Sequence, residues 1–168
     1  LGPRYGPQDI STTVWSFSTL KIDSPSFYDV AAKSIASKVS QNYHFRPQEC
    51  SNILWAMSNA NCLPGSLGQI SDAEEDNSVE VARKITSMFN DDHASSNSNI
   101  FISAYANLSE VLIKRPAEFK SQELKDLLWS FSKASFRHPH LFKSTAIHLL
   151  KRGVDDFSPQ STSNILWA

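Results

Sequence analysis

Phe45-Arg46-Pro47-Gln48-Glu49-Cys50-Ser51-Asn52-Ile53-Leu54-Trp55-Ala56 is the stretch that decides the fold, because its last six residues return unchanged at 163–168. This second copy also follows a phenylalanine, a proline and a glutamine. Looser copies begin at Tyr5 and Phe119. All four tryptophans of the chain fall at the same place in these copies: Trp15, Trp55, Trp129 and Trp167. The chain is therefore built from repeats.

The repeat period is about 40 residues, the range of stacked supersecondary units. Trp55 follows Trp15 by 40 residues and Trp167 follows Trp129 by 38, but 74 residues separate Trp55 from Trp129. The long gap predicts two units, the second of which has Ile102 in place of its tryptophan. We therefore predict units over 5–44, 45–88 with an acidic insertion at 63–78, a degenerate unit over 89–118, a unit over 119–156, and a truncated one over 157–168. The truncation indicates that the sequence is part of a longer protein.

Each unit has the pattern of a helical hairpin. Pro7 suits the first position of a helix, and Ile10, Val14 and Phe17 follow at helical spacing. Ser121 stands at the proline position of a later copy, where its hydroxyl is expected to cap the helix. The sequence predicts a single all-α domain: an α-solenoid of stacked helical hairpins of about 38–40 residues, comparable to armadillo and HEAT superhelices.

The tryptophans are predicted to be structural. On a helical wheel Trp15 lies to the side of the apolar arc, so the first helix of each unit must be covered from two directions. Burying a tryptophan removes about 150 to 250 Å² from water. We assign Trp15, Trp55, Trp129 and Trp167 to the repeat core, with stacking on nucleic-acid bases as the alternative role.

Charge is unevenly distributed along the chain. The net charge is -1, but 70–92 carries seven acids and two bases (net -5), and 111–152 carries nine bases and three acids (net +6). A basic stripe can therefore exist within a neutral total. No apolar run is long enough to span a membrane. Cys50 and Cys62 have no metal-site spacing and are expected to be reduced thiols.

Catalytic patterns are weak. His138, His140 and His148 have no thiol or carboxylate at ligand spacing, and no serine or cysteine lies in a nucleophile motif. The five glycines form no phosphate-binding loop. We therefore expect no enzymatic activity, metal or cofactor in this chain.

The helix surface that faces away from the apolar arcs is the candidate binding surface. It carries three positions per unit: first Asp9, Glu49, Glu123 and Ser161; second Thr12, Asn52, Asp126 and Asn164; third Thr19, Asn59 and Lys133. Small hydrogen-bonding side chains, one set per repeat, suit the reading of unstacked RNA bases. The alternative is an asparagine ladder that binds the backbones of neighbouring helices. Candidate phosphate contacts are Lys114, Arg115, Lys125, Lys133 and Arg137.

The motif Phe-x-Pro-Gln-x-x-Ser-Asn-Ile-Leu-Trp-Ala at steps of 38 to 40 residues resembles octotricopeptide-type and heptatricopeptide repeats of RAP-domain organelle proteins. It is also similar to the repeat domain named after a kinetoplastid RNA-editing substrate-binding complex. The resemblance covers the first helix of four units and leaves 63–114 poorly matched. It implies a protein of the mitochondrion or chloroplast that binds single-stranded RNA, alone or with protein subunits of an RNA-processing complex, during processing, stabilisation, editing or translation. The competing hypothesis is a HEAT- or armadillo-like scaffold for protein partners.

Overall fold

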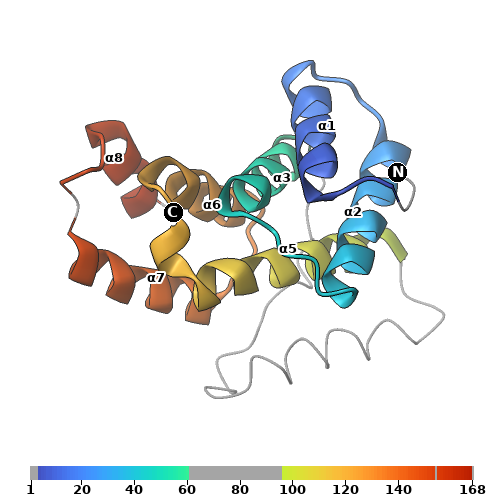
Figure 1. Ribbon diagram of the computed structural model, residues 1–168. Coiled ribbons are helices and arrows are strands. Elements are labelled where there is room, and N and C mark those ends of the chain that lie inside the picture. Colours follow the sequence, from blue (N-terminus) through green and yellow to red (C-terminus); the bar gives the residue numbers. More distant parts are fainter. Residues whose placement is uncertain (1–3, 61–95, 154, 168) are drawn as a thin grey trace.

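The computed structural model describes residues 4–60, 96–153 and 155–167, which form helices and short connections (Figure 1). The elements are α1 (Pro7–Thr19), α2 (Pro25–Ser40), α3 (Pro47–Asn59), α5 (Ser96–Lys114), the 3-10 turn η1 (Pro116–Glu118), α6 (Ser121–Lys133), α7 (Pro139–Arg152) and α8 (Pro159–Trp167). The predicted all-α class is confirmed over these residues. Each described helix is too short or too polar to cross a membrane. The insertion expected at 63–78 and Cys62 lie outside the described residues.

Helix α1 begins at Pro7, as the sequence predicts, and three helices share an acidic cap. The carboxylate of the third helical residue accepts a hydrogen bond from the backbone N–H just before the helix, at 2.7 to 2.9 Å: Asp9 from Gly6, Glu49 from Arg46, and Glu123 from Lys120. This contact satisfies a free N–H and places negative charge at the positive end of the helix. The prediction that Ser121 caps α6 is wrong, because Ser121 is the first helical residue and Glu123 supplies the cap.

The helices lie in two rows (Figure 1). In the first row α1 packs against α3, α3 against α6, and α6 against α8. In the second row α2 packs against α5, and α5 against α7. Helices α1 and α2 also contact each other, as do α3 and α5, and these contacts join the rows. The helices that begin with the repeated motif therefore form one layer, and the helices between them form the other.

The position of α5 differs from the sequence prediction. A separate unit over 89–118 would place its helix in the first row, between α3 and α6. Instead α3 packs directly on α6, and α5 lies in the second row between α2 and α7. Helix α5 thus contacts α3 from the second row, and residues 61–95 of the interval between Trp55 and Trp129 lie outside the described residues. Ile102 is a residue of this second-row helix and does not replace a tryptophan.

The pairing of α5 with α3 is supported by a contact that we call the arginine clasp, a hydrogen bond from an arginine at the end of a second-row helix to the backbone just before a first-row helix. Arg115, just after α5, donates from Nη2 to the backbone oxygen of Phe45, just before α3, at 2.8 Å. Arg152, at the end of α7, donates from Nη1 to the backbone oxygen of Phe119, just before α6, at 2.7 Å. Each arginine also pairs with an acid that follows it, Glu118 or Asp156. The same contact therefore closes both hairpins, although 70 residues separate the partners in one and 33 in the other.

Removing one arginine clasp tests how much it contributes to the stability of the fold. We expect Arg115→Ala to lower the free energy of unfolding by about 1.5 to 3 kcal/mol, the usual range for a hydrogen bond to a charged group. The adjacent Lys114→Ala is the control, because Lys114 is exposed and pairs only with Glu110 on its own helix; a change below about 1 kcal/mol is expected. Urea unfolding followed by circular dichroism measures both. Equal effects of the two substitutions would show that the Phe45 contact does not stabilise the hairpin.

The pattern of burial distinguishes four sides of each first-row helix. We number the positions of each helix from its first residue, which is Pro7, Pro47, Ser121 or Pro159. Position 4 points inward and is fully buried in α1, α3 and α6 as Ile10, Cys50 and Leu124. Among the described helices of the first row, α1 contacts only α3, and it buries positions 5 and 8. Within the same set α8 contacts only α6, and it buries position 3. Positions 5 and 8 therefore face the next helix in the row, and positions 3 and 7 face the previous one.

Candidate nucleic-acid interface

The fourth side of each first-row helix is a stripe of polar and aromatic residues at positions 2, 6, 9 and 13. At 100° per residue these positions span about 60° of the helix, opposite position 4. We call this surface the outer stripe. It consists of Gln8, Thr12, Trp15 and Thr19 on α1; Gln48, Asn52, Trp55 and Asn59 on α3; Gln122, Asp126, Trp129 and Lys133 on α6; and Gln160, Asn164 and Trp167 on α8. None of these residues is buried.

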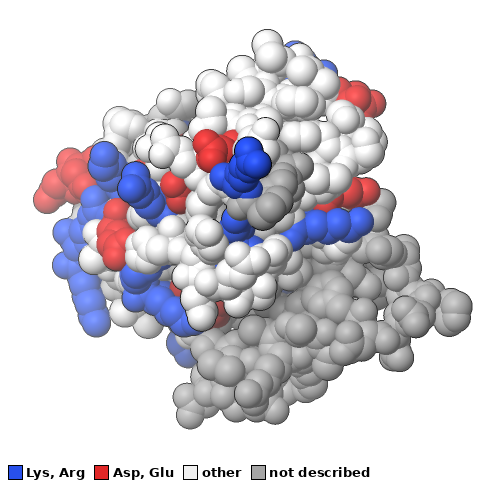
Figure 2. Space-filling view, turned by 45° about the vertical axis from the view of Figure 1, so that its right-hand side comes forward, with Lys and Arg blue, Asp and Glu red and all other residues white. Residues whose placement is uncertain are grey.

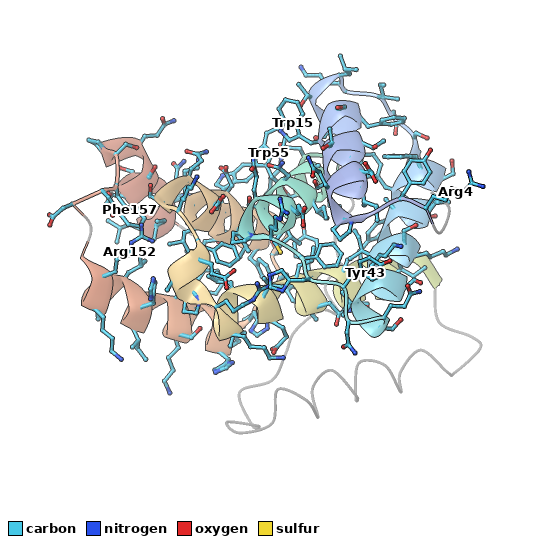
Figure 3. The ribbon with its side chains drawn as sticks, viewed as in Figure 1. Arg4, Trp15, Tyr43, Trp55, Arg152 and Phe157 are labelled. Atoms are coloured by element: carbon cyan, nitrogen blue, oxygen red, sulfur yellow. The ribbon has the colours of Figure 1, made fainter. Side chains whose placement is uncertain are left out.

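Trp15 and Trp167 are exposed on this surface and lie outside the core to which the sequence interpretation assigned them, whereas Trp55 packs against the core. Trp15 is 43% exposed and Trp167 is 68% exposed, while Trp55 and Trp129 are half-buried. Figure 3 shows Trp15 and Trp55 on the side of α1 and α3 that is turned away from the second row. The space between the rows is filled by smaller residues and by phenylalanines and tyrosines such as Phe131 and Tyr105. The indole faces therefore remain partly accessible.

The asparagines at position 6 do not bond to neighbouring helices within the described residues. Asn52 and Asn164 are half-buried, and neither side-chain amide has a hydrogen-bond partner within the part of the chain that the structure describes. Thr12 is exposed at the same position of α1. Asp126, by contrast, is engaged: its carboxylate accepts from Gln122 Nε2 at 2.7 Å and pairs with Lys125 Nζ at 2.8 Å. This position thus offers free amide groups on α3 and α8 and a bonded carboxylate on α6.

Position 13 links neighbouring helices. Lys133 Nζ on α6 donates to Asn59 Oδ1 on α3 at 2.7 Å and lies 4.8 Å from the centre of the Trp129 ring. Asn59 Nδ2 donates to the backbone oxygen of Trp55 at 3.0 Å. Burial lowers the pKa of Lys133. These contacts give Asn59 and Lys133 a structural role between α3 and α6, and Thr19 is the exposed counterpart on α1.

The other residues predicted to bind RNA do not gather on the outer stripe. Asp9, Glu49 and Glu123 are helix caps. Lys114 and Arg115 lie at the end of α5 in the second row, where Arg115 forms the clasp. Arg137 is exposed in the connection between α6 and α7. Lys125, at position 5 of α6, pairs with Asp126. The predicted cations thus share no single face.

Charge and the outer stripe are largely separate. Asp126 and Lys133 are the only charged members of the stripe as defined. Figure 2 shows basic side chains gathered towards the α7 end of the molecule, while the upper part of the same view is mostly uncharged. Helix α7 carries the exposed residues Lys143, Lys151 and Arg152. A ligand on the stripe would meet amides and indoles before it met cations.

Ionisable groups inside the fold are structural. Cys50 is buried between the rows, and burial, with a further contribution from Glu49, raises the pKa of its thiol. His138 Nδ1 accepts a hydrogen bond from the Leu141 N–H and caps α7, and Nε2 lies 3.2 Å from Ser109 Oγ on α5. In the ranges 4–60, 96–153 and 155–167, no three His, Cys, Asp or Glu side chains lie close enough to hold a metal ion.

The sequence analysis missed the grouping of the glutamines with the asparagines and tryptophans. The signal was present, because Gln-x-x-x-Asn-x-x-Trp-x-x-x-Asn has the i, i+4, i+7 and i+11 spacing of one helix face. No family model, curated protein or solved structure matches the chain. The resemblance to octotricopeptide-type repeats therefore rests on the repeated motif alone.

Proposed function

We propose that the chain is part of an α-solenoid that binds single-stranded RNA along the outer stripe and acts in organellar RNA metabolism. The observation that supports this proposal is the stripe itself: glutamine and tryptophan recur in the same register on α1, α3, α6 and α8, with threonine, asparagine or aspartate between them, and none of these side chains is buried. Indole faces stack on bases, and amide groups bond to base edges. The organelle and the class of transcript process come from the resemblance.

Because the outer stripe is nearly neutral, we expect RNA binding to depend only weakly on salt concentration. Each phosphate neutralised on a single strand contributes about -0.7 to the slope of log K against log salt. Lys133 is the one cation within the stripe, so we expect a slope no steeper than about -1.5. Binding would then depend mainly on stacking and hydrogen bonds.

The test is selection from a pool of random single-stranded RNA at two salt concentrations, followed by affinity measurements on the selected sequence. Trp15→Ala removes an exposed indole and is expected to weaken binding roughly 5- to 150-fold, since stacking contributes about 1 to 3 kcal/mol per base. Asn52→Ala is expected to change the preferred base. Lys151→Ala is the control, because Lys151 lies on the second-row helix α7. Circular dichroism verifies that each variant is folded.

A protein-interaction scaffold is the second candidate. The neutrality of the stripe favours it, because exposed tryptophans on a weakly charged surface are typical of protein interfaces. Absence of RNA binding at low salt by the folded chain would reject the RNA proposal and favour this one. A steep salt slope that Lys151→Ala reduces and Trp15→Ala leaves unchanged would instead place RNA on α7, away from the outer stripe.

A further inference from the structure

One face of α8 is exposed although the same sequence is buried elsewhere in the chain. Leu166 is 82% exposed, whereas Leu54, at the same place in the same six-residue sequence on α3, is fully buried. Ser163 is exposed and its counterpart Ser51 is buried. These are positions 8 and 5, which face the next helix of the row. In α1 and α6, too, position 8 is buried, as Val14 and Leu128.

The second row has a similar exposed residue at the same end of the molecule. Leu150 lies two residues before the clasp arginine of α7 and is 86% exposed. Ile113 lies two residues before the clasp arginine of α5 and packs against the core. The exposed apolar residues thus occur on both α7 and α8, the last helices of their rows.

We propose that the face of α8 formed by Ser163 and Leu166 is a docking site for a further helix of this chain's own repeat type. The evidence is continuity with an interface that already exists, because α6 packs against α3 and Leu54, at position 8 of α3, is fully buried. The helices that follow another in the row carry an apolar residue at position 7, on the side that faces the previous helix: Ile53, Leu127 and Ile165. The partner helix is therefore expected to have isoleucine or leucine there.

A second copy of α1 does not meet this requirement. Its position 7 is Thr13, whose hydroxyl donates to the Asp9 backbone oxygen at 2.7 Å. At position 10, Ser16 Oγ donates to the Thr12 backbone oxygen at 2.9 Å. This side of α1 is polar, and its hydroxyl groups already donate hydrogen bonds within their own helix. The docking site on α8 thus selects for helices of the α3, α6 or α8 pattern. The inference is independent of RNA binding.

The test extends the chain in register. Trp167 is at position 9 of α8, Ala168 follows it in the sequence, and Phe131 is at position 11 of α6. Residues 131–167 appended after Ala168 would therefore continue the repeat sequence in register, with the sequences of α7 and α8 after it. Because stacked repeats are coupled to their neighbours, we expect one unfolding transition, a higher Tm than that of the original chain, and more helix by circular dichroism.

Leu166→Asp shows whether the added helix packs on Leu166 or is only attached to the chain. In the original chain it should shift Tm by no more than about 2 °C. In the extended chain it should lower Tm by about 5 to 10 °C or split the transition, because the aspartate would be buried in the new interface. Asn164→Asp is the control: it adds the same charge to the same helix on the outer stripe, and it should leave Tm nearly unchanged in both chains.

Three results would overturn the proposal. The added segment could remain unfolded or melt separately, or Leu166→Asp could have equal effects in the two chains. Alternatively, sedimentation could show that the original chain forms a dimer that Leu166→Asp dissociates, in which case a second copy occupies this face.

Discussion

Leu54→Ala is expected to lower the free energy of unfolding by about 2 to 5 kcal/mol, the range for removing a fully buried leucine side chain. Leu54 lies in α3 and has no exposed surface. Its loss would leave a cavity where α3 packs against its neighbours, and close-packed side chains would fill it only in part. Urea unfolding monitored by tryptophan fluorescence and circular dichroism would measure the change.

Leu166→Ala is the matched control. The two leucines stand in the same six-residue sequence, but Leu54 is in the middle of α3 and fully buried, whereas Leu166 is next to the last residue of α8. With Leu166 82% exposed, the substitution should change stability by less than about 0.5 kcal/mol. Similar losses for the two variants would mean that α8 is covered in solution or that α3 is not at the centre of the first row.

Acidification from pH 6.5 to 4 is expected to remove about 3 kcal/mol of stability through His138. Burial, followed by repulsion from His140, lowers the pKa of His138 to about 4 from an ordinary value of 6.5. The unfolded chain therefore binds a proton in this interval that the folded chain does not, so stability falls as the pH falls. Above pH 6.5 the contribution is complete, and below about pH 4 no more is lost.

The surroundings of His138 explain this shift. Its Nδ1 accepts from the Leu141 N–H, so the neutral ring carries its proton on Nε2, which faces Ser109 Oγ. The rings of Phe131 and Phe136 lie against it. Protonation would remove the cap of α7 and place a charge among aromatic rings.

His138→Asn separates this titration from the others. Asparagine retains an acceptor at the N-cap but does not titrate. The difference in stability between the original chain and the variant should therefore depend on pH between 4 and 6.5 and be constant above 6.5. The same substitution at the exposed His140 should leave most of that dependence in place. A parallel pH profile for the original chain and His138→Asn would contradict a depressed pKa at His138.

The sequence predicted the first-row helices well because local chemistry determines them. Pro7, Pro47 and Pro159 stand at first helical positions, and the apolar residues at four-residue spacing mark the inward side. These signals do not depend on distant contacts. Helix α1 accordingly begins at Pro7, the predicted first helical position.

The row to which α5 belongs was less predictable. The repeated motif marks first-row helices only, and α5 has no equivalent signature. Spacing between tryptophans suggests how many units lie between them, but it does not show to which row a helix such as α5 belongs. Arg115 carried the missing information, but a lone arginine does not reveal in sequence that it bonds to Phe45, 70 residues earlier.

The candidate site was predicted in part. Thr12, Asn52 and Asn164 lie on an accessible surface, as expected, but side-chain size misled the interpretation of the tryptophans. A large apolar side chain gains most from burial, yet position 9 lies on the side of these helices that faces neither the second row nor a neighbour in the first row. The roles of the lysines and arginines were harder to predict, because a lysine or arginine that bonds to a backbone oxygen looks the same in sequence as one that is free to bind phosphate.

The arginine clasp also bears on how sequences of this kind can change in length. Five residues connect α1 to α2 and α6 to α7, whereas 36 lie between α3 and α5. The entropic cost of closing a chain grows only with the logarithm of its length, so this difference amounts to at most about 2 kcal/mol. A charged hydrogen bond such as that of Arg115 offsets a cost of that size. Insertions within a clasped hairpin can therefore accumulate without altering the spacing of the first-row helices, which allows one unit to acquire a new segment while its neighbours keep their register.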